Sequence, residues 1–151
     1  QATDVLEGKA QVGERVVVIG GELVGCETAE YLAEKGRKVT VTRRGPEMAT
    51  GVGPMLRSFF LDRLEKLGVT LLTGVTYNEV VDGGLVVSTS DGKTRTIEAD
   101  TIVLAAGATP EQRLRKEIEG SVAEIHLVGD CAQPRTVREA IADGYAVGLA
   151  I

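Results

Sequence analysis

The glycine-rich turn at residues 18–25 has the residue types and spacing best suited to chemistry. It reads Val-Ile-Gly-Gly-Glu-Leu-Val-Gly, with glycines at the first and last positions of a dinucleotide-binding fingerprint. The first glycine of such a turn permits a tight bend from strand to helix, and the last lets the helix pack closely on the sheet. The helix N-terminus then offers free N–H groups to a pyrophosphate. We therefore predict a nucleotide site shaped by Gly20, Gly21, Glu22 and Gly25; a plain strand–helix turn is the alternative.

Glu22 stands where the fingerprint has its middle glycine, which normally lets the backbone approach the phosphates. Two like charges at ~4 Å repel by about 4 kcal/mol at an effective dielectric of 20. The Glu22 side chain must therefore turn outward, or nucleotide binding is weakened. A purely structural role is also open, because a carboxylate in the first turn of a helix is stabilised by roughly 0.3–1 kcal/mol.

Two arginines, Arg43 and Arg44, follow the next strand-like run, where an NAD site normally carries an acidic residue for the ribose hydroxyls. A guanidinium can instead form paired hydrogen bonds with the 2′-phosphate of NADPH. This substitution predicts that NADP(H) is preferred over NAD(H). The alternative is that both arginines are solvated loop residues.

Hydrophobic periodicity places these residues between alternating strands and helices. The predicted buried strands are 15–19, 38–42, 69–72, 101–105 and 124–128, and the predicted helices are 23–35, one from Pro54 with Leu56, Phe59, Phe60, Leu64 and Leu67 on one stripe, and one from Thr136. Alternating segments separated by Asp-Gly turns predict a three-stranded antiparallel meander within residues 75–98. The fold class is therefore α/β, a Rossmann-like parallel sheet flanked by helices with an antiparallel meander.

Composition excludes several classes of partner. The 151 residues hold 17 basic and 22 acidic side chains, a net charge of −5, with no basic stripe, so we expect no nucleic-acid partner. No apolar run approaches the ~18 residues of a membrane span, so we expect no membrane partner. The two cysteines, Cys26 and Cys131, form no CxxC pair, and a cytoplasmic location is expected. We expect the Cys26 thiol to be buried and inert.

Four segments together resemble the two-dinucleotide-binding flavoproteins, and more narrowly the NADH:flavin oxidoreductases related to 2,4-dienoyl-CoA reductase, enoate reductase and trimethylamine dehydrogenase. They are the turn and helix start at 20–29, the meander, Leu-Ala-Ala-Gly-Ala-Thr-Pro at 104–110, and Val-Gly-Asp-Cys at 128–131. The resemblance implies FAD in the parent protein, with FMN and an iron–sulfur cluster in a separate amino-terminal part. It implies that Gly129-Asp130 meets the flavin ribityl chain, and that Glu27 and Gly107 lie toward the nicotinamide.

The same resemblance implies that the chain is cut from a longer polypeptide. Residues 1–14 would be a linker or lead-in helix, 15–110 the NAD(P)-binding domain, 111–123 a connection, and 124–151 a returning strand and helix of the parent FAD-binding domain. In this chain we expect the strand 124–128 to lie parallel beside 101–105 as a fifth strand. The remaining domains of the parent would be partners, and the fragment alone is expected to bind the dinucleotide without turnover. A non-catalytic module that binds ADP or docks its neighbours is the rival function, favoured by Glu22.

Overall fold

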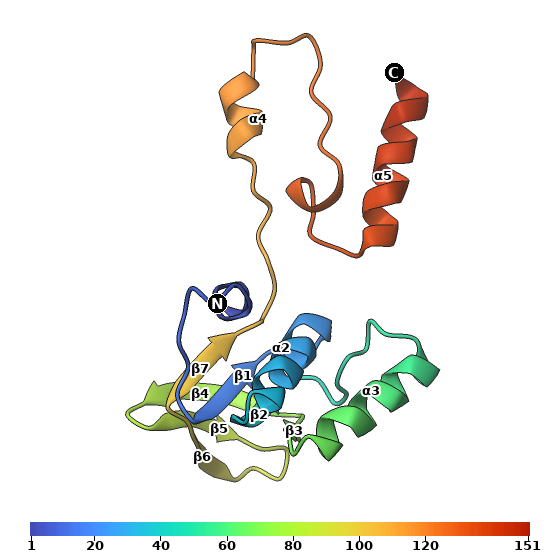
Figure 1. Ribbon diagram of the computed structural model, residues 1–151. Coiled ribbons are helices and arrows are strands. Elements are labelled where there is room, and N and C mark those ends of the chain that lie inside the picture. Colours follow the sequence, from blue (N-terminus) through green and yellow to red (C-terminus); the bar gives the residue numbers. More distant parts are fainter. The chain divides into compact units, whose positions relative to one another are not determined.

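Short β-branched runs form a parallel sheet in the first of two structural units. The computed structural model describes residues 1–151, which divide into Gln1–Ala106 and Gly107–Ile151. The sheet contains β1 (Arg15–Ile19), β2 (Lys38–Thr42), β3 (Thr70–Leu72) and β7 (Thr101–Leu104), in the order β3-β2-β1-β7. All three pairings are parallel (Figure 1). Val17 of β1 pairs with Thr40 of β2 on one side and with Ile102 of β7 on the other.

The sheet is covered on both faces, which explains why β1 is apolar from Val16 to Ile19. Val16 and Val18 pack on the face covered by α1 (Ala2–Leu6), α2 (Leu23–Glu34) and α3 (Pro54–Lys66). Val17 packs on the opposite face, against the meander of β4 (Thr76–Val81), β5 (Gly84–Ser88) and β6 (Thr94–Glu98). Because side chains alternate along a strand, a strand covered on both faces needs apolar residues at every position. The predicted α/β fold with its antiparallel meander is confirmed.

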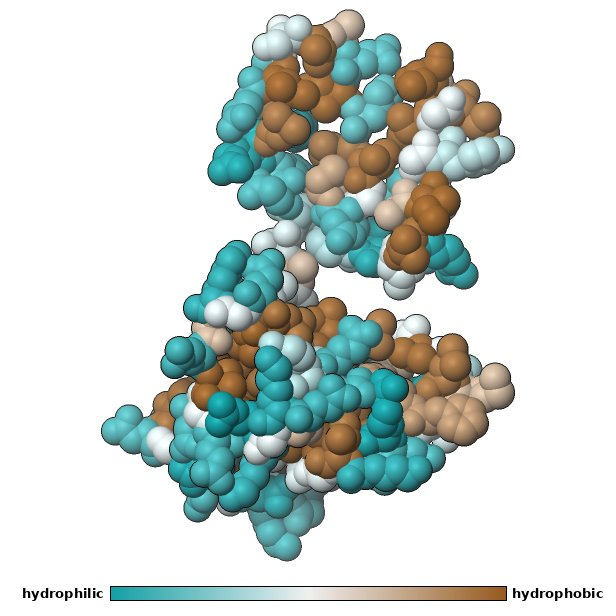
Figure 2. Space-filling model, viewed as in Figure 1, coloured by the Kyte–Doolittle hydropathy of each residue, from teal (hydrophilic) through white to brown (hydrophobic).

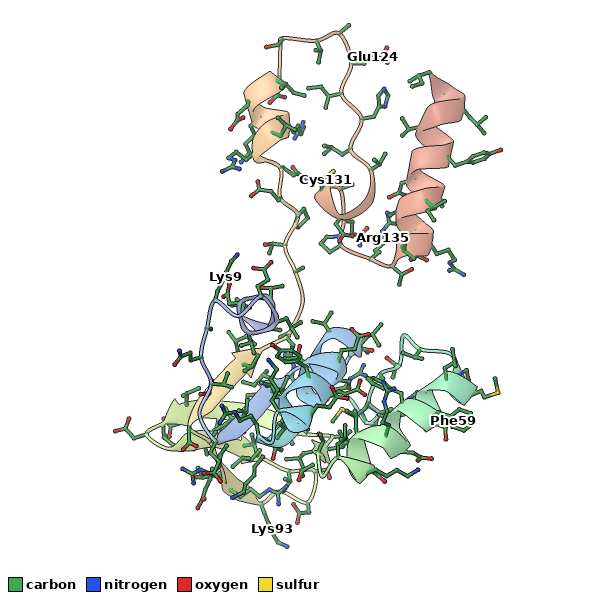
Figure 3. The ribbon with its side chains drawn as sticks, in the orientation of Figure 1. Lys9, Phe59, Lys93, Glu124, Cys131 and Arg135 are labelled. Atoms are coloured by element: carbon green, nitrogen blue, oxygen red, sulfur yellow. The ribbon has the colours of Figure 1, made fainter.

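Helix α3 differs from its predicted stripe. Its buried face runs through Phe60, Leu61 and Leu64, whereas Leu56 and Phe59 are exposed. Figure 3 shows Phe59 on the outer side of the helix. One residue corresponds to about 100° around an α-helix, so Phe59 and Phe60 cannot both face the core. The periodicity identified the helix but wrongly placed Leu56 and Phe59 on its buried stripe.

The second unit contains α4 (Arg113–Ile118), the 3-10 turn η1 (Gly129–Cys131) and α5 (Val137–Ala150). Helix α5 begins with a capping box in which the Thr136 amide donates to the Glu139 carboxylate at 3.2 Å. The Gly129 amide donates to Asp143 of α5 at 3.2 Å, and the Gln112 side chain donates to the Cys131 carbonyl at 2.9 Å. These polar contacts organise the unit, since neither α4 nor α5 contributes a buried residue.

Helix α5 exposes an apolar stripe at four-residue spacing: Val137, Ile141, Tyr145 and Leu149. Figure 2 shows hydrophobic side chains at the surface of this unit. The stripe accounts for the helical periodicity seen in the sequence, but here no apolar layer covers it.

The strand predicted over residues 124–128 does not form, and the expected fifth strand is wrong. The segment has no ladder partner, and the parallel sheet ends with four strands at β7. Its residues are exposed or half-buried, and the His126 ring lies 3.2 Å from the Glu124 carboxylate. A strand requires a neighbour for its N–H and C=O groups, and the second unit contains no strand to supply one.

Candidate functional site

The carboxyl ends of β1, β2 and β7 meet at one edge of the parallel sheet, and the glycine turn lies there. The Gly20 amide donates to the carbonyl of Thr42 at the end of β2, at 3.0 Å. The Ala105 amide, just after β7, donates to the carbonyl of Ile19 at 2.8 Å. The turn is therefore tied to both neighbouring strands, at the edge where ligands bind in open α/β sheets.

Gly20 and Gly25 occupy positions that no larger residue can fill. Gly20 has φ +124°, and a Cβ there would lie 2.3 Å from the Ala105 carbonyl oxygen. A Cβ on Gly25 would lie 1.8 Å from the Gly20 carbonyl oxygen. The structure records no protein acceptor for the amides of residues 21–24. These N–H groups, at the positive end of the α2 dipole, form a cradle suited to an anion.

Gly21 has a different neighbour, the loop of residues 43–53 between β2 and α3. A Cβ on Gly21 would lie 2.3 Å from the Met48 sulfur and 2.9 Å from the Arg43 Cβ. The Ala49 amide donates to the Gly21 carbonyl at 2.6 Å, and Met48 and Ala49 are buried. Ala49 adopts φ +50°, an uncommon conformation for a residue with a side chain. The loop is thus packed onto the glycine turn.

Glu22, the N-cap residue of α2, directs its carboxylate to this loop. It pairs with the Arg43 guanidinium, accepts a hydrogen bond from the Thr50 hydroxyl, and accepts another from the Gly51 amide at 3.2 Å. Partial burial acts to raise the Glu22 pKa, but the bonds from Thr50 and Gly51, together with Arg43, outweigh it and lower the pKa. At neutral pH the carboxylate is therefore ionised, and it is bound to protein groups of the loop.

The two arginines differ in their surroundings. The Arg43 side chain is 21% exposed and contacts Glu22, and its Nη2 also donates to the Thr50 hydroxyl at 3.1 Å. Its Nη1 is buried without a hydrogen-bond partner. Arg44 is exposed and takes part in no ion pair. Of these two arginines, only Arg44 thus has a guanidinium that is not paired with an acidic group.

Cys26 lies beneath the turn. Its thiol is buried and contacts the Gly21 carbonyl at 3.6 Å. Burial, reinforced by the charge of Glu22, raises the pKa of this thiol to about 11. At neutral pH it is protonated, which agrees with an inert core cysteine.

The remaining predicted residues are distributed over both units. The Glu27 side chain is exposed on α2, in the first unit. Gly107 has φ +118° and begins the second unit, which also holds Gly129 and Asp130. Gly129 is buried in η1, while Asp130 is exposed and its carboxylate accepts a hydrogen bond from the Arg135 amide at 3.3 Å. The glycine turn, Glu22 and Arg43 are brought together within the first unit.

Four residues at the site were not identified from the sequence. Thr50 and Gly51 bind Glu22, and the glycine-rich loop that carries them was the only available signal. Leu23 and Val24, at the start of the predicted helix 23–35, are both exposed in the first turn of α2. Their backbone amides belong to the amide cradle, and their apolar side chains are open to solvent.

The chain brings together no group of three His, Cys, Asp or Glu side chains that could hold a metal ion. None of its helices combines the length and hydrophobicity needed to span a bilayer.

Comparison with known proteins agrees with this geometry. The family model described as pyridine nucleotide-disulphide oxidoreductase matches residues 1–144. An NADH oxidase from Thermoanaerobacter brockii is 38% identical over all of this chain and 24% of its own length. A cinnamate reductase from Clostridium sporogenes is 31% identical over 97% of this chain and 22% of its own length.

A solved structure of a 2-naphthoyl-CoA reductase complex has 40% sequence identity and a TM-score of 0.90, covering 99% of this chain and 23% of its own. The chain thus spans about a quarter of the length of these relatives. The matched family, the identities and the glycine turn at the sheet edge agree: the chain belongs to the pyridine nucleotide-disulphide oxidoreductase family.

Proposed function

We propose that this chain is the pyridine-nucleotide-binding part of a multidomain flavin-dependent oxidoreductase, and that it takes NADPH in preference to NADH. The narrower relationship, to the 2,4-dienoyl-CoA, enoate reductase and trimethylamine dehydrogenase group, belongs to the same proposal. The observation that carries it is the cradle of unpaired amides at residues 21–24, placed at the carboxyl edge of the sheet.

The residues present fit a dinucleotide. The absence of a Cβ at Gly20 and Gly25 keeps the turn close to the sheet, so that the amides after Gly20 can reach a pyrophosphate. The exposed Leu23 and Val24 offer apolar contact beside it. Glu27 and Gly107 are assigned toward the nicotinamide by the family resemblance. When bound, the coenzyme would supply hydride to a flavin, while protein groups position the reactants.

Preference for NADPH depends on the arginines that follow β2. Arg44 is exposed and has no acidic partner, so its guanidinium is available to bind a 2′-phosphate. Arg43 is held by Glu22 and contributes less while that pair persists. Arg44 is therefore the proposed principal determinant of the preference.

We assign the flavin to the parent protein. Gly129 and Asp130 would meet FAD there, together with segments outside this chain. Any FMN and iron–sulfur cluster would also be held by other segments. Cys26 and Cys131 are both free, in keeping with the proposed cytoplasmic location.

Calorimetric titration of the chain with NADPH, NADH and ADP tests the proposal. We expect NADPH to bind about tenfold more tightly than NADH, the effect of one charge-assisted contact. Arg44→Gln should remove that difference. Arg37→Gln is the control: it removes an exposed arginine just before the first residue of β2, and it should leave the difference in affinity unchanged. Equal affinities in the unmodified chain would overturn the NADPH preference.

One observation favours a second function. The Glu22 carboxylate adds negative charge beside the amide cradle and pairs with the Arg43 guanidinium. This arrangement suits a non-catalytic module that binds ADP or serves only as a docking surface for neighbouring domains. ADP binding as tight as NADPH binding would support this alternative, because the nicotinamide half would then contribute nothing.

A further inference from the structure

The ion pair between Glu22 and Arg43 joins the two positions at which this chain departs from an NAD-type fingerprint. Glu22 replaces the middle glycine, and Arg43 stands where an acidic residue normally binds the ribose. The two residues are far apart in sequence, yet their charged groups meet. The end of β2 thus carries an arginine instead of the usual acidic residue, and the glycine turn supplies the carboxylate that pairs with this arginine.

The guanidinium is incompletely satisfied in this arrangement. Nη2 contacts the Glu22 carboxylate and donates to Thr50 at 3.1 Å, whereas Nη1 is buried with no acceptor. A buried donor without a partner is unfavourable, and more so on a charged group. Moving the guanidinium from Glu22 to a phosphate that accepts from both terminal nitrogens would relieve this cost.

The loop has other attachments that do not require Glu22. The Ala49 amide donates to the Gly21 carbonyl at 2.6 Å, and the Met48 side chain is buried over Gly21. Arg57 of α3 donates to the Met48 carbonyl at 2.6 Å. Losing the Glu22 carboxylate therefore frees Arg43 while the loop stays in place.

We propose that Glu22 is a specificity-determining residue: its carboxylate competes with the 2′-phosphate of the coenzyme for the Arg43 guanidinium. This inference rests on the proposed function. A ligand with a 2′-phosphate can bind the Arg43 guanidinium only by displacing the Glu22 carboxylate, whereas NADH has no 2′-phosphate. Glu22 thus limits the affinity for NADPH and makes the difference in affinity between NADPH and NADH smaller.

Titration of Glu22→Gln with NADPH and NADH tests the competition. NADPH should bind about tenfold more tightly than to the unmodified chain, the effect of one charge-assisted contact, and NADH affinity should change far less. Glu22→Gln combined with Arg43→Gln should lose the gain. Glu22→Gly removes the same carboxylate and glycine is accepted at an N-cap, so it should show the same order even if the glutamine variant folds poorly.

Glu30→Gln is the matched control, because Glu30 also lies on α2 and also pairs with an arginine, Arg63, away from the glycine turn. It should leave both affinities unchanged. Equal tightening for NADPH and NADH, no change, or weaker NADPH binding by both Glu22 variants would overturn the competition and leave the proposed function intact. Failure of every variant to bind either coenzyme would overturn both.

Discussion

Gly25 is the residue with the least space around it in the glycine turn. A Cβ there would lie 1.8 Å from the Gly20 carbonyl oxygen, a backbone atom that cannot move aside cheaply. We expect Gly25→Ala to destabilise the fold by about 1–3 kcal/mol, as overpacking does, and to abolish dinucleotide binding. Thermal melting followed by circular dichroism, with NADPH titration, measures both effects.

Gly144→Ala is the matched control for this substitution. Gly144 lies within α5, and a Cβ there would meet nothing within 4 Å. Alanine is favoured over glycine inside a helix by roughly 0.5–1 kcal/mol, so this variant should be unchanged or slightly stabilised. Equal melting temperatures for the two variants would contradict the tight approach of α2 to the turn.

The geometry of single residues could be predicted where it depends on local chain conformation. The spacing of Gly20 and Gly25 indicated the turn because a close backbone approach requires glycine itself. The partner of Glu22 could not be predicted, because an ion pair between distant segments leaves no local pattern. Charge repulsion predicted that Glu22 either turns outward or weakens nucleotide binding, whereas its partners Thr50 and Gly51 were identified only by the structure.

At the scale of elements, Asp100 joins β1 to the segment that precedes β7. Its carboxylate accepts hydrogen bonds from the Arg15 amide at 2.8 Å and from Arg15 Nη2 at 2.6 Å. These contacts lower the Asp100 pKa from its ordinary value of 3.8 to about 2. A depressed carboxyl pKa contributes stability that is complete above the ordinary value and is lost as the pH falls through the folded-state pKa.

We therefore expect Asp100→Asn to lower the Tm near neutral pH, and the Tm difference from the unmodified chain to shrink as the pH falls from about 5 toward 2. Asp62→Asn on α3 is the control, because Asp62 is exposed and takes part in no ion pair. Melting curves across this pH range make the comparison. A Tm difference that stays constant down to the lowest pH would show that ionised Asp100 is not the stabilising group.

Elements were predictable from sequence where their partners lie within the same unit. β1 and β2 have their predicted bounds, because a β-branched run between covering layers leaves a clear pattern. The segment 124–128 also carries apolar residues, Ile125, Leu127 and Val128, but it forms no strand, since the second unit offers no neighbour to hydrogen-bond with it. Periodicity reports which residues are apolar, and strand formation also requires a partner.

At the scale of the whole molecule, burial is concentrated in the first unit. Both hydrophobic clusters lie within residues 1–106, whereas α4 and α5 contribute no buried side chain. The stripe of Val137, Ile141, Tyr145 and Leu149 remains exposed. An uncovered apolar helix face is typical of an interaction surface, which supports our proposal that this chain is part of a multidomain oxidoreductase.

This distribution predicts that a chain ending at Ala106 keeps the stability of the first unit. Removing residues 107–151 deletes no member of either cluster, so we expect the Tm to change by less than about 4 °C, equivalent to under ~1 kcal/mol for a domain of this size. In the complete chain, amide hydrogens of α5 should exchange faster than those of β1 and α2, because α5 is not anchored by buried contacts. Loss of cooperative melting on truncation, or equal exchange protection of α5 and β1, would show that the second unit stabilises the first through contacts that the clusters do not include.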